Sequence, residues 1–269
     1  MGPVSEESNE AYGGCREQEG RDPDTPQQLR PSITYDINTP NVLRASSGEP
    51  NLRPFTANNF DLSFEWYYED ASYLSLAGFI KQVGNFIVER VEKQTFNLAS
   101  GPYIYDIRRP SNGEAANVRG VELSWQHDFR RLPAPFDGIG VQANLTLVDS
   151  NAKVELDNVT ETFALEGLSN TRNLVLYYDK GALQLRAALN QRGDFLESIS
   201  GRGGEPVFVE GYTQIDLCGS FAITENFTGF FQAINVTDAR IRKHGRFANH
   251  FLELKDTGAR YALGIRATF

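Results

Sequence analysis

The sequence predicts an all-β chain in which about nine antiparallel strands form one part of a transmembrane barrel wall. Three observations support this prediction. Apolar and polar residues alternate over strand lengths, the connections alternate between short and long, and aromatic residues make up 12% of the 269 residues. Strands favour aromatic and β-branched residues, whereas a helix would place residues two apart on different faces.

The composition argues against two other classes of protein. With a net charge of -9 and a pI near 5.0, the chain lacks the basic face that a nucleic-acid partner requires. No run of 18 apolar residues predicts a transmembrane helix, but a transmembrane strand needs only about 9–11 residues. The mean hydropathy of -0.41 is compatible with such strands and equally with a soluble protein.

The N-terminal residues 1–56 are predicted to be irregular, and the barrel portion is predicted over residues 57–269. The first segment is rich in Pro, Ser, Asn, Asp and Glu and shows little periodicity. Residues Met1 to Gln28 contain no basic region followed by an apolar one, so no signal peptide is visible. We therefore expect either that another segment precedes this one or that the chain is not exported.

The first two strands are predicted at residues 59–69 and 73–89, with a short turn at residues 69–71. In the first strand, apolar residues occupy every even position from Phe60 to Tyr68. This period of two over a full strand length is typical of a strand with two different faces.

The next two strands, at residues 116–129 and 139–147, show the same alternation. Val121, Leu123 and Trp125 alternate with polar residues in the third strand, and the fourth strand has apolar residues at its odd positions. Two prolines in the connection between them cannot donate to a ladder, which favours a turn at residues 130–137.

The remaining five strands are predicted at residues 173–178, 183–190, 213–221, 227–232 and 258–269. The fifth strand of the chain is apolar on both faces and gives no clear register, and Phe230 interrupts the alternation of the eighth. The ninth strand has apolar residues at odd positions from Tyr261 to the terminal Phe269.

The connections fall into two classes of length. Those after the first, third, fifth and seventh strands are short, and those after the second, fourth, sixth and eighth are long. The long connections are predicted as loops at residues 90–113, 150–168, 193–206 and 237–256. This pattern is typical of an outer-membrane barrel, which has short periplasmic turns and long extracellular loops.

The alternation also predicts which residues face lipid. An Arg on the lipid face near the midplane costs about 2–4 kcal/mol, so charged residues are expected to face the lumen. Five charged residues follow this rule, namely Glu65, Glu122, Arg186, Asp216 and Arg266. Eight apolar residues are expected to share the opposite surface, namely Phe60, Leu62, Phe64, Leu123, Leu145, Leu185, Leu217 and Leu263.

Several short motifs occur in a fixed order along the chain. They are Gly48-Glu49-Pro50-Asn51-Leu52-Arg53-Pro54 followed by Asn59, Asp61 and Glu65; Gly120-Val121-Glu122; Asn144 and Thr146 before Asp149-Ser150; Asn235-Val236-Thr237-Asp238; and Gly258, Arg260 and Tyr261 before Phe269. In this order they resemble the barrel of TonB-dependent outer-membrane receptors over roughly residues 45–269. Glu49 departs from the family pattern, which usually has Asn there.

The resemblance implies a barrel of about 22 strands around an N-terminal plug. The chain would then be the C-terminal part of that barrel, without the plug and about thirteen strands. It implies a receptor for energised uptake of an iron chelate, cobalamin or a carbohydrate. The implied partners are outer-membrane lipid, the barrel-assembly machinery, a small nutrient and, only through the missing plug, the TonB system.

Two other functions stay open beside this one. The chain could be a truncated barrel fragment that does not transport, or a small outer-membrane barrel enzyme. A hydrolase triad would have to use His127, His244 or His250, and no Gly-x-Ser-x-Gly motif lies near them. The spacing of His244 and His250 matches no metal site, and no cofactor is expected.

Candidate functional residues lie near the C-terminus. Tyr261, Leu263, Ile265 and Phe269 are similar to the terminal signal that the barrel-assembly machinery reads. Arg240, Arg242, Lys243 and Arg246 form a basic stretch that would attract an anionic ligand or lipopolysaccharide phosphates. Trp66 and Trp125 are expected in an interfacial aromatic girdle, and Cys218 as a small buried thiol.

Overall fold

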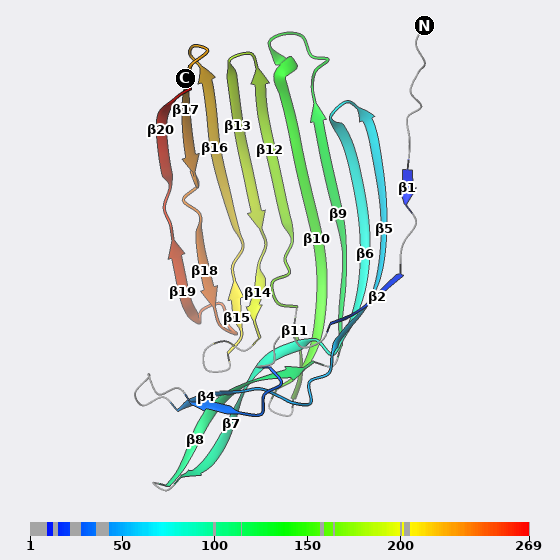
Figure 1. Ribbon diagram of the computed structural model, residues 1–269, viewed down its shortest axis with the longest axis vertical. Helices are drawn as coiled ribbons and strands as arrows, with labels where there is room; N and C mark the ends of the chain where they lie inside the picture. Colours follow the sequence, from blue (N-terminus) through cyan, green and yellow to red (C-terminus); the bar gives the residue numbers. More distant parts are fainter. Residues whose placement is uncertain are drawn as a thin grey trace.

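Strands dominate the computed structural model, which describes residues 10–12, 16–21, 28–35, 43–98, 101–113, 115–156, 159–163, 165–199, 201 and 205–268 (Figure 1). Nine long strands lie side by side in sequence order in one antiparallel sheet. They are β5 (Phe55–Glu69), β6 (Ser72–Gly84), β9 (Ala115–Asp128), β10 (Ile139–Leu156), β12 (Thr171–Lys180), β13 (Leu183–Arg192), β16 (Tyr212–Ala222), β17 (Phe227–Ile234) and β20 (Arg260–Ala267). Each overlaps one predicted strand, so the predicted all-β class and strand count are confirmed.

The sheet is an open wall in the described part of the chain. The strand β20 pairs only with β17 and forms one edge. At the other edge β5 pairs with β1 (Glu10–Tyr12) and β2 (Arg16–Arg21). Part of the segment that was predicted to be irregular therefore continues the wall, because its backbone pairs with β5.

Short turns and long excursions fall at opposite ends of the wall (Figure 1). The Pro-rich turn at the short-turn end contains one turn of 3-10 helix, η1 (Phe136–Gly138). Among the described residues, no helix has the length and apolar character needed to cross a membrane.

The long excursions were predicted as loops, and this prediction is wrong for much of their length. Strands β7 (Ile87–Leu98) and β8 (Gly101–Asn112) form a hairpin, and β11 (Val159–Phe163) pairs with the outer end of β10. The strands β14 (Phe195–Ser198), β15 (Val207–Val209), β18 (Arg240–His244) and β19 (Phe251–Asp256) form a sheet of their own. These strands do not separate an apolar face from a polar one. Apolar and polar residues therefore do not alternate along them, and the sequence gives no sign that they are strands.

The ladder register fixes the two faces of the wall. Directly paired residues share a face, and so do residues two apart along a strand. Following the pairs from Phe64 through Leu76, Leu123 and Leu145 onwards confirms that the eight predicted apolar residues share one face. The five predicted charged residues lie on the other face. Cys218 also lies there, half-buried beside Arg186 and Gln232, which corrects its expected apolar setting.

An aromatic cluster lies on the apolar face near the short turns. Trp125 donates through Nε1 to the Tyr68 hydroxyl at 3.0 Å, and the ring of Trp66 lies 4.9 Å from that of Tyr68. The same hydroxyl lies 3.1 Å from Nδ1 of His127. A bulge between Tyr67 and Glu69 leaves Tyr68 out of the pairing with β6. Both tryptophans therefore lie at one border of the apolar face, where interfacial aromatic residues are expected.

Candidate functional site

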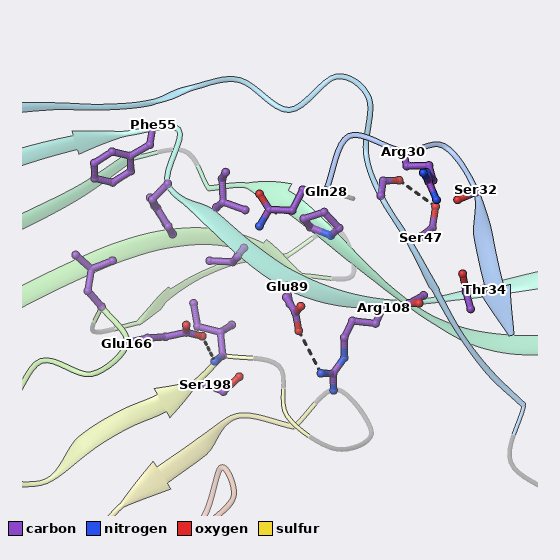
Figure 2. Close-up of a pocket in the computed structure, with 18 of the residues that line it drawn as sticks. Gln28, Arg30, Ser32, Thr34, Ser47, Phe55, Glu89, Arg108, Glu166 and Ser198 are labelled. Atoms are coloured by element: carbon purple, nitrogen blue, oxygen red, sulfur yellow. Dashed lines mark hydrogen bonds and ion pairs between the residues drawn. The ribbon is translucent and has the colours of Figure 1, made fainter. Parts of the chain in front are cut away.

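The opposite end of the wall carries a cavity of 1150 Å³. It is lined by residues 28–34, by β4 (Arg44–Ser47), by the hairpin of β7 and β8, and by residues of the two following excursions. Polar residues from all of these segments line it, namely Gln28, Arg30, Ser32, Thr34, Ser46, Ser47, Glu89, Arg108, Glu166 and Ser198. All of them except Ser46 are labelled in Figure 2. We call this space the mouth cavity.

Small residues on the lumen face explain why the excursions pack here. Ala57, Val83 and Ala116 are paired across β5, β6 and β9, and all three are buried. Phe86 and Val88 pack on them from the start of the β7 excursion. The hairpin of β7 and β8 is therefore attached at its base to the lumen side of the wall.

Two further excursions join the same cluster. Leu196 and Ile199 are buried in it, and Glu166 accepts a hydrogen bond from the backbone N–H of Ile199 at 2.6 Å. Ser150 accepts a hydrogen bond from the Leu165 N–H at 3.0 Å. These contacts bring segments more than a hundred residues apart in sequence to one cavity.

Asn112 pins the hairpin to the start of β5. Its side-chain amide donates to the carbonyls of Arg53 and Asn85, at 3.0 and 2.8 Å, and its Oδ1 accepts from the Arg53 N–H at 2.7 Å. Backbone groups thus satisfy both N–H groups of this amide and one of the two lone pairs of its oxygen. The position of the mouth cavity is therefore set by backbone contacts on both sides of the hairpin.

The charged lining of the mouth cavity is balanced. It has two cations, Arg30 and Arg108, and two anions, Glu89 and Glu166. Arg108 and Glu89 form an ion pair of 3.2 Å across the hairpin (Figure 2). The Oε1 atom of Gln28 is buried with no hydrogen-bond partner among the described residues. The cavity thus has little net charge, and most of its polar lining groups are hydroxyl and amide groups that can form hydrogen bonds with a ligand.

The predicted basic stretch lies outside this cavity and is ion-paired. Arg240 contacts Asp256 at 2.9 Å and Asp238 at 3.2 Å, and Arg242 pairs with Glu210. Lys243 contacts Glu197 at 2.9 Å and Glu253 at 3.0 Å. Hydrogen bonds to Glu197 and Glu253 raise the pKa of the Lys243 ammonium above its ordinary value. Attraction of anions by Arg240, Arg242, Lys243 and Arg246 stays a prediction, and these partners offset part of the positive charge.

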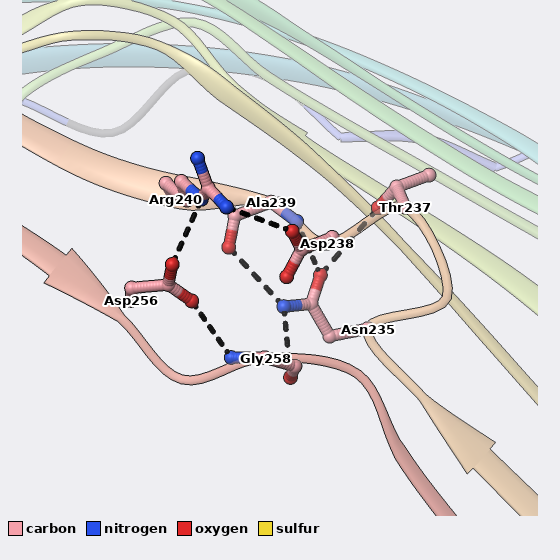
Figure 3. A network of polar contacts seen from close by, with 7 residues as sticks. All are labelled: Asn235, Thr237, Asp238, Ala239, Arg240, Asp256 and Gly258. Atoms are coloured by element: carbon pink, nitrogen blue, oxygen red, sulfur yellow. Dashed lines mark hydrogen bonds and ion pairs between the residues drawn. The ribbon is translucent and has the colours of Figure 1, made fainter.

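The sheet of β14, β15, β18 and β19, called the outer sheet below, is held to the hairpin of β16 and β17 by a buried polar network (Figure 3). Asn235, only 3% exposed and with φ of 56°, donates to the carbonyls of Ala239 and Gly258 at 3.1 and 3.3 Å. Its Oδ1 accepts from the Ala239 N–H at 2.8 Å, and its own N–H donates to Asp216 at 2.8 Å. The asparagine thereby joins β16, β17 and the approach to β20.

The other predicted site residues lie apart from the mouth cavity. Tyr261, Leu263 and Ile265 lie on the apolar face at the β20 edge, and Leu263 is 87% exposed. Phe269 lies outside the described residues. The described residues contain no group of three His, Cys, Asp or Glu that could hold a metal ion. Sequence reasoning missed the mouth cavity, since no motif marks the polar residues that line it.

Comparison with known proteins gives a family match and several similar folds. A family model described as TonB dependent receptor-like, beta-barrel matches residues 22–236. A search of curated proteins finds no match. The siderophore receptor PirA from Acinetobacter baumannii is 18% identical, with a TM-score of 0.61 over 95% of this chain and 38% of that one.

Two further solved structures are similar in the same way. The Q482A mutant of the ferric enterobactin receptor PfeA from Pseudomonas aeruginosa, in complex with enterobactin, is 18% identical, with a TM-score of 0.62 over 95% of this chain and 38% of that one. The FrpB iron transporter from Neisseria meningitidis is 13% identical, with a TM-score of 0.54 over 83% and 32%. The chain therefore spans less than two fifths of each of these three proteins, and the likeness shows the fold.

Proposed function

Because the chain belongs to the TonB-dependent receptor β-barrel family, we propose that it supplies wall and outer mouth to a receptor for nutrient uptake. The barrels of this family are outer-membrane proteins, and the similar structures are transport receptors. In this proposal the nutrient is bound from outside, and TonB acts through the plug domain of the receptor. The chain itself carries out no chemical reaction on the nutrient.

One observation carries the proposal most directly. The excursions at one end of the wall pack on its lumen side and enclose the mouth cavity. At 1150 Å³ this cavity slightly exceeds the range of about 300–1,000 Å³ that is usual for small-molecule pockets. A ligand that enters the barrel from the long-excursion end would meet these residues first.

The lining favours an oxygen-rich ligand of low net charge. Hydroxyl and amide groups outnumber the charged groups, and the two Arg are matched by two Glu. A strongly anionic chelate would lie beside Glu89 and Glu166, and bringing like charges together costs binding free energy. Within the classes that the family takes up, we propose a neutral iron chelate or a carbohydrate rather than a highly charged anion.

Energy-dependent uptake by cells that express the protein tests the proposal. A panel of radiolabelled ligands would include a neutral hydroxamate chelate, an anionic catecholate chelate, cobalamin and an oligosaccharide. The expected result is uptake of one low-charge ligand that stops when a protonophore removes the driving force. Energy-dependent uptake of the catecholate alone would contradict the proposed ligand class, and no uptake of any ligand would contradict the receptor function.

Arg108→Gln links the uptake to the mouth cavity. Losing its ion pair with Glu89 leaves a carboxylate unpaired in the lining, so we expect the apparent KM to rise about tenfold, the equivalent of about 1.4 kcal/mol. The matched control is Arg130→Gln at the short-turn end, which removes an ion pair of similar length, Arg130–Asp128 at 3.0 Å. An equal rise in the apparent KM of both variants would show that uptake does not depend on the mouth cavity.

The alternative of a transport-inactive barrel fragment has one observation in its favour. In the described part of the chain the wall is open, and β20 has no second neighbour. Unpaired edge groups cost several kcal/mol each in hydrocarbon, so such a wall needs further strands to span a membrane. Co-purification of the chain with no other barrel segment and no uptake would favour this alternative.

A further inference from the structure

Two arginines are paired directly across the hairpin of β7 and β8. Arg90 and Arg109 are partners in its ladder, so their side chains leave the same face with Cβ atoms about 4.5–5.5 Å apart. Glu89 and Arg108, which line the mouth cavity, occupy the adjacent positions. Because side chains alternate along a strand, the two arginines lie on the opposite face of the hairpin from the mouth cavity.

This placement of two cations is unfavourable by itself. Like charges directly opposite each other destabilise a pair of strands. Solvent screens the repulsion only in part, because the Arg109 side chain is 29% exposed and Ile107, two residues away on the same face, is 1% exposed. The two guanidinium groups therefore need negative charge close to both of them.

The described part of the chain supplies little of this charge. Glu92 lies 3.8 Å from Arg109, which is longer than a hydrogen bond, and Arg90 forms no ion pair with a described residue. The Nε atoms of both arginines are buried with no hydrogen-bond partner among the described residues. Buried donors are paired in nearly all native structures, so two such donors on neighbouring cations indicate a site for an external acceptor.

A cavity of 450 Å³ lies beside this pair, between the hairpin and the segment before β5. Its lining includes Arg53, Arg109, Glu49 and Glu92. Oε1 of Glu49 already accepts from the backbone N–H and the side-chain amide of Asn51, at 3.0 and 3.1 Å. Together with the ladder partner of Arg109, the site has three cations against two carboxylates, and one of these carboxylates is engaged elsewhere.

We propose that this cavity binds a phosphate group between Arg90 and Arg109. One edge of a guanidinium group donates two parallel hydrogen bonds to two oxygens of an anion. A phosphate monoester has three terminal oxygens, so two guanidinium groups can each bind two of them by sharing one. A carboxylate has two oxygens and fills only one such edge. Turning each guanidinium plane toward the phosphate gives its Nε–H an acceptor and offsets the repulsion across the ladder.

The phosphate has two sources at the end of the wall that carries the long excursions. One is the phosphate groups of lipopolysaccharide around the barrel, and the other is free phosphate or a phosphorylated solute. Both present the same oxygens to the arginines. The site lies on the other face of the hairpin from the mouth cavity, so it does not depend on the nutrient proposed for that cavity.

Calorimetric titration with inorganic phosphate tests the proposal. The protein is extracted from outer membranes in mild detergent and titrated at constant ionic strength. We expect the Kd for phosphate to rise at least about tenfold in Arg90→Gln, the equivalent of about 1.4 kcal/mol. Lys93→Gln is the matched control, because Lys93 is an exposed cation of the same strand on the opposite face. A Kd that rises equally in both variants, or in neither, would overturn the proposal.

Hydrogen exchange of residues 87–112 separates a binding role from a structural one. Without phosphate, Arg90→Gln removes a repulsion, so its hairpin amides are expected to exchange no faster than those of the parent protein. With phosphate, exchange is expected to slow in the parent protein and in Lys93→Gln, but not in Arg90→Gln. Faster exchange of Arg90→Gln in the absence of phosphate would show that Arg90 stabilises the hairpin by itself and would overturn the proposal.

Native mass spectrometry of the same preparations identifies the source of the phosphate. Retention of lipopolysaccharide that falls about tenfold in Arg90→Gln assigns the site to lipopolysaccharide phosphate. Equal retention, together with the expected rise in Kd, assigns it to free phosphate or a phosphorylated solute. Equal retention, together with no phosphate binding by the parent protein, would overturn the proposal.

Discussion

At the scale of single residues, several aromatic rings of the wall lie directly over glycines of the neighbouring strand. The ring of Tyr177 covers Gly140, its direct partner across β10 and β12. A Cβ atom on Gly140 would lie 2.2 Å from this ring, and one on Gly264 would lie 2.6 Å from Phe230. Only glycine leaves room for these rings, which explains why apparent breaks in the alternation occur without a break in the strand.

Gly140→Ala is expected to destabilise the wall. The new methyl must displace the Tyr177 ring, and overpacking of this kind costs about 1–3 kcal/mol. Gly78→Ala is the matched control, because its Cβ would meet nothing closer than a backbone oxygen at 3.9 Å. The heat-modifiable electrophoretic shift of the barrel, followed over temperature, measures both. Equal midpoint temperatures for Gly140→Ala and Gly78→Ala would show that the Tyr177 ring can move without a cost in stability.

Asn235 is expected to control the attachment of the outer sheet. In Asn235→Ala the Ala239 N–H and the carbonyls of Ala239 and Gly258 lose their partner, and each buried group left unpaired costs about 1–3 kcal/mol. Trypsin should therefore cleave between residues 240 and 256 faster in this variant. The exposed Asn249→Ala serves as control. Equal cleavage rates would contradict the role given to Asn235.

At the scale of elements, the nine wall strands were predictable from the sequence and the outer strands were not. A wall strand separates lipid from lumen, so its side chains alternate and the period of two is visible. The hairpin of β7 and β8 has no such division. Its pairing is supported by cross-strand ion pairs, such as Arg109 with Glu92 at 3.8 Å. In a sequence, charged residues of this kind look the same as those of a loop.

The outer sheet is expected to lose stability in alkali. The pKa of Lys243 is raised in the folded state, chiefly by its hydrogen bond to Glu197 and then by that to Glu253. Its contribution is therefore complete below its ordinary pKa of 10.5 and is lost as the pH rises through the higher folded value. The difference in melting temperature between the protein and Lys243→Gln should be constant from about pH 8 to 10 and shrink above it. A difference that does not change with pH would contradict this linkage.

At the scale of the whole molecule, the sequence predicted the lipid face of the wall but not the mouth cavity. The lipid face follows from alternation, because one rule of polarity applies along every strand. The mouth cavity is lined by Gln28, Arg108, Glu166 and Ser198, among others, and these residues lie on separate segments. Nothing in their local sequence indicates that they meet, so neither the cavity nor its charge balance could be derived beforehand.

Deleting Phe269 is expected to reduce assembly rather than ligand affinity. Tyr261, Leu263 and Ile265 line one exposed face of the last strand, and a terminal aromatic residue completes the proposed assembly signal. The amount of heat-modifiable barrel in outer membranes should fall several-fold, while the molecules that do assemble bind ligand normally. A Thr268→Ala change, which keeps the terminal aromatic residue, is the control. Unchanged barrel levels after the deletion would contradict the signal.

The central claim is that one face of each wall strand meets lipid and the other meets the water-filled lumen, and cysteine scanning of β9 tests it most directly. Single cysteines replace each residue from Val121 to Trp125, with Cys15 and Cys218 changed to Ser, in outer membranes of intact cells. A membrane-restricted thiol reagent should label positions 121, 123 and 125, and a water-soluble reagent should label positions 122 and 124. Labelling of all five positions by the water-soluble reagent alone would contradict the membrane-spanning wall.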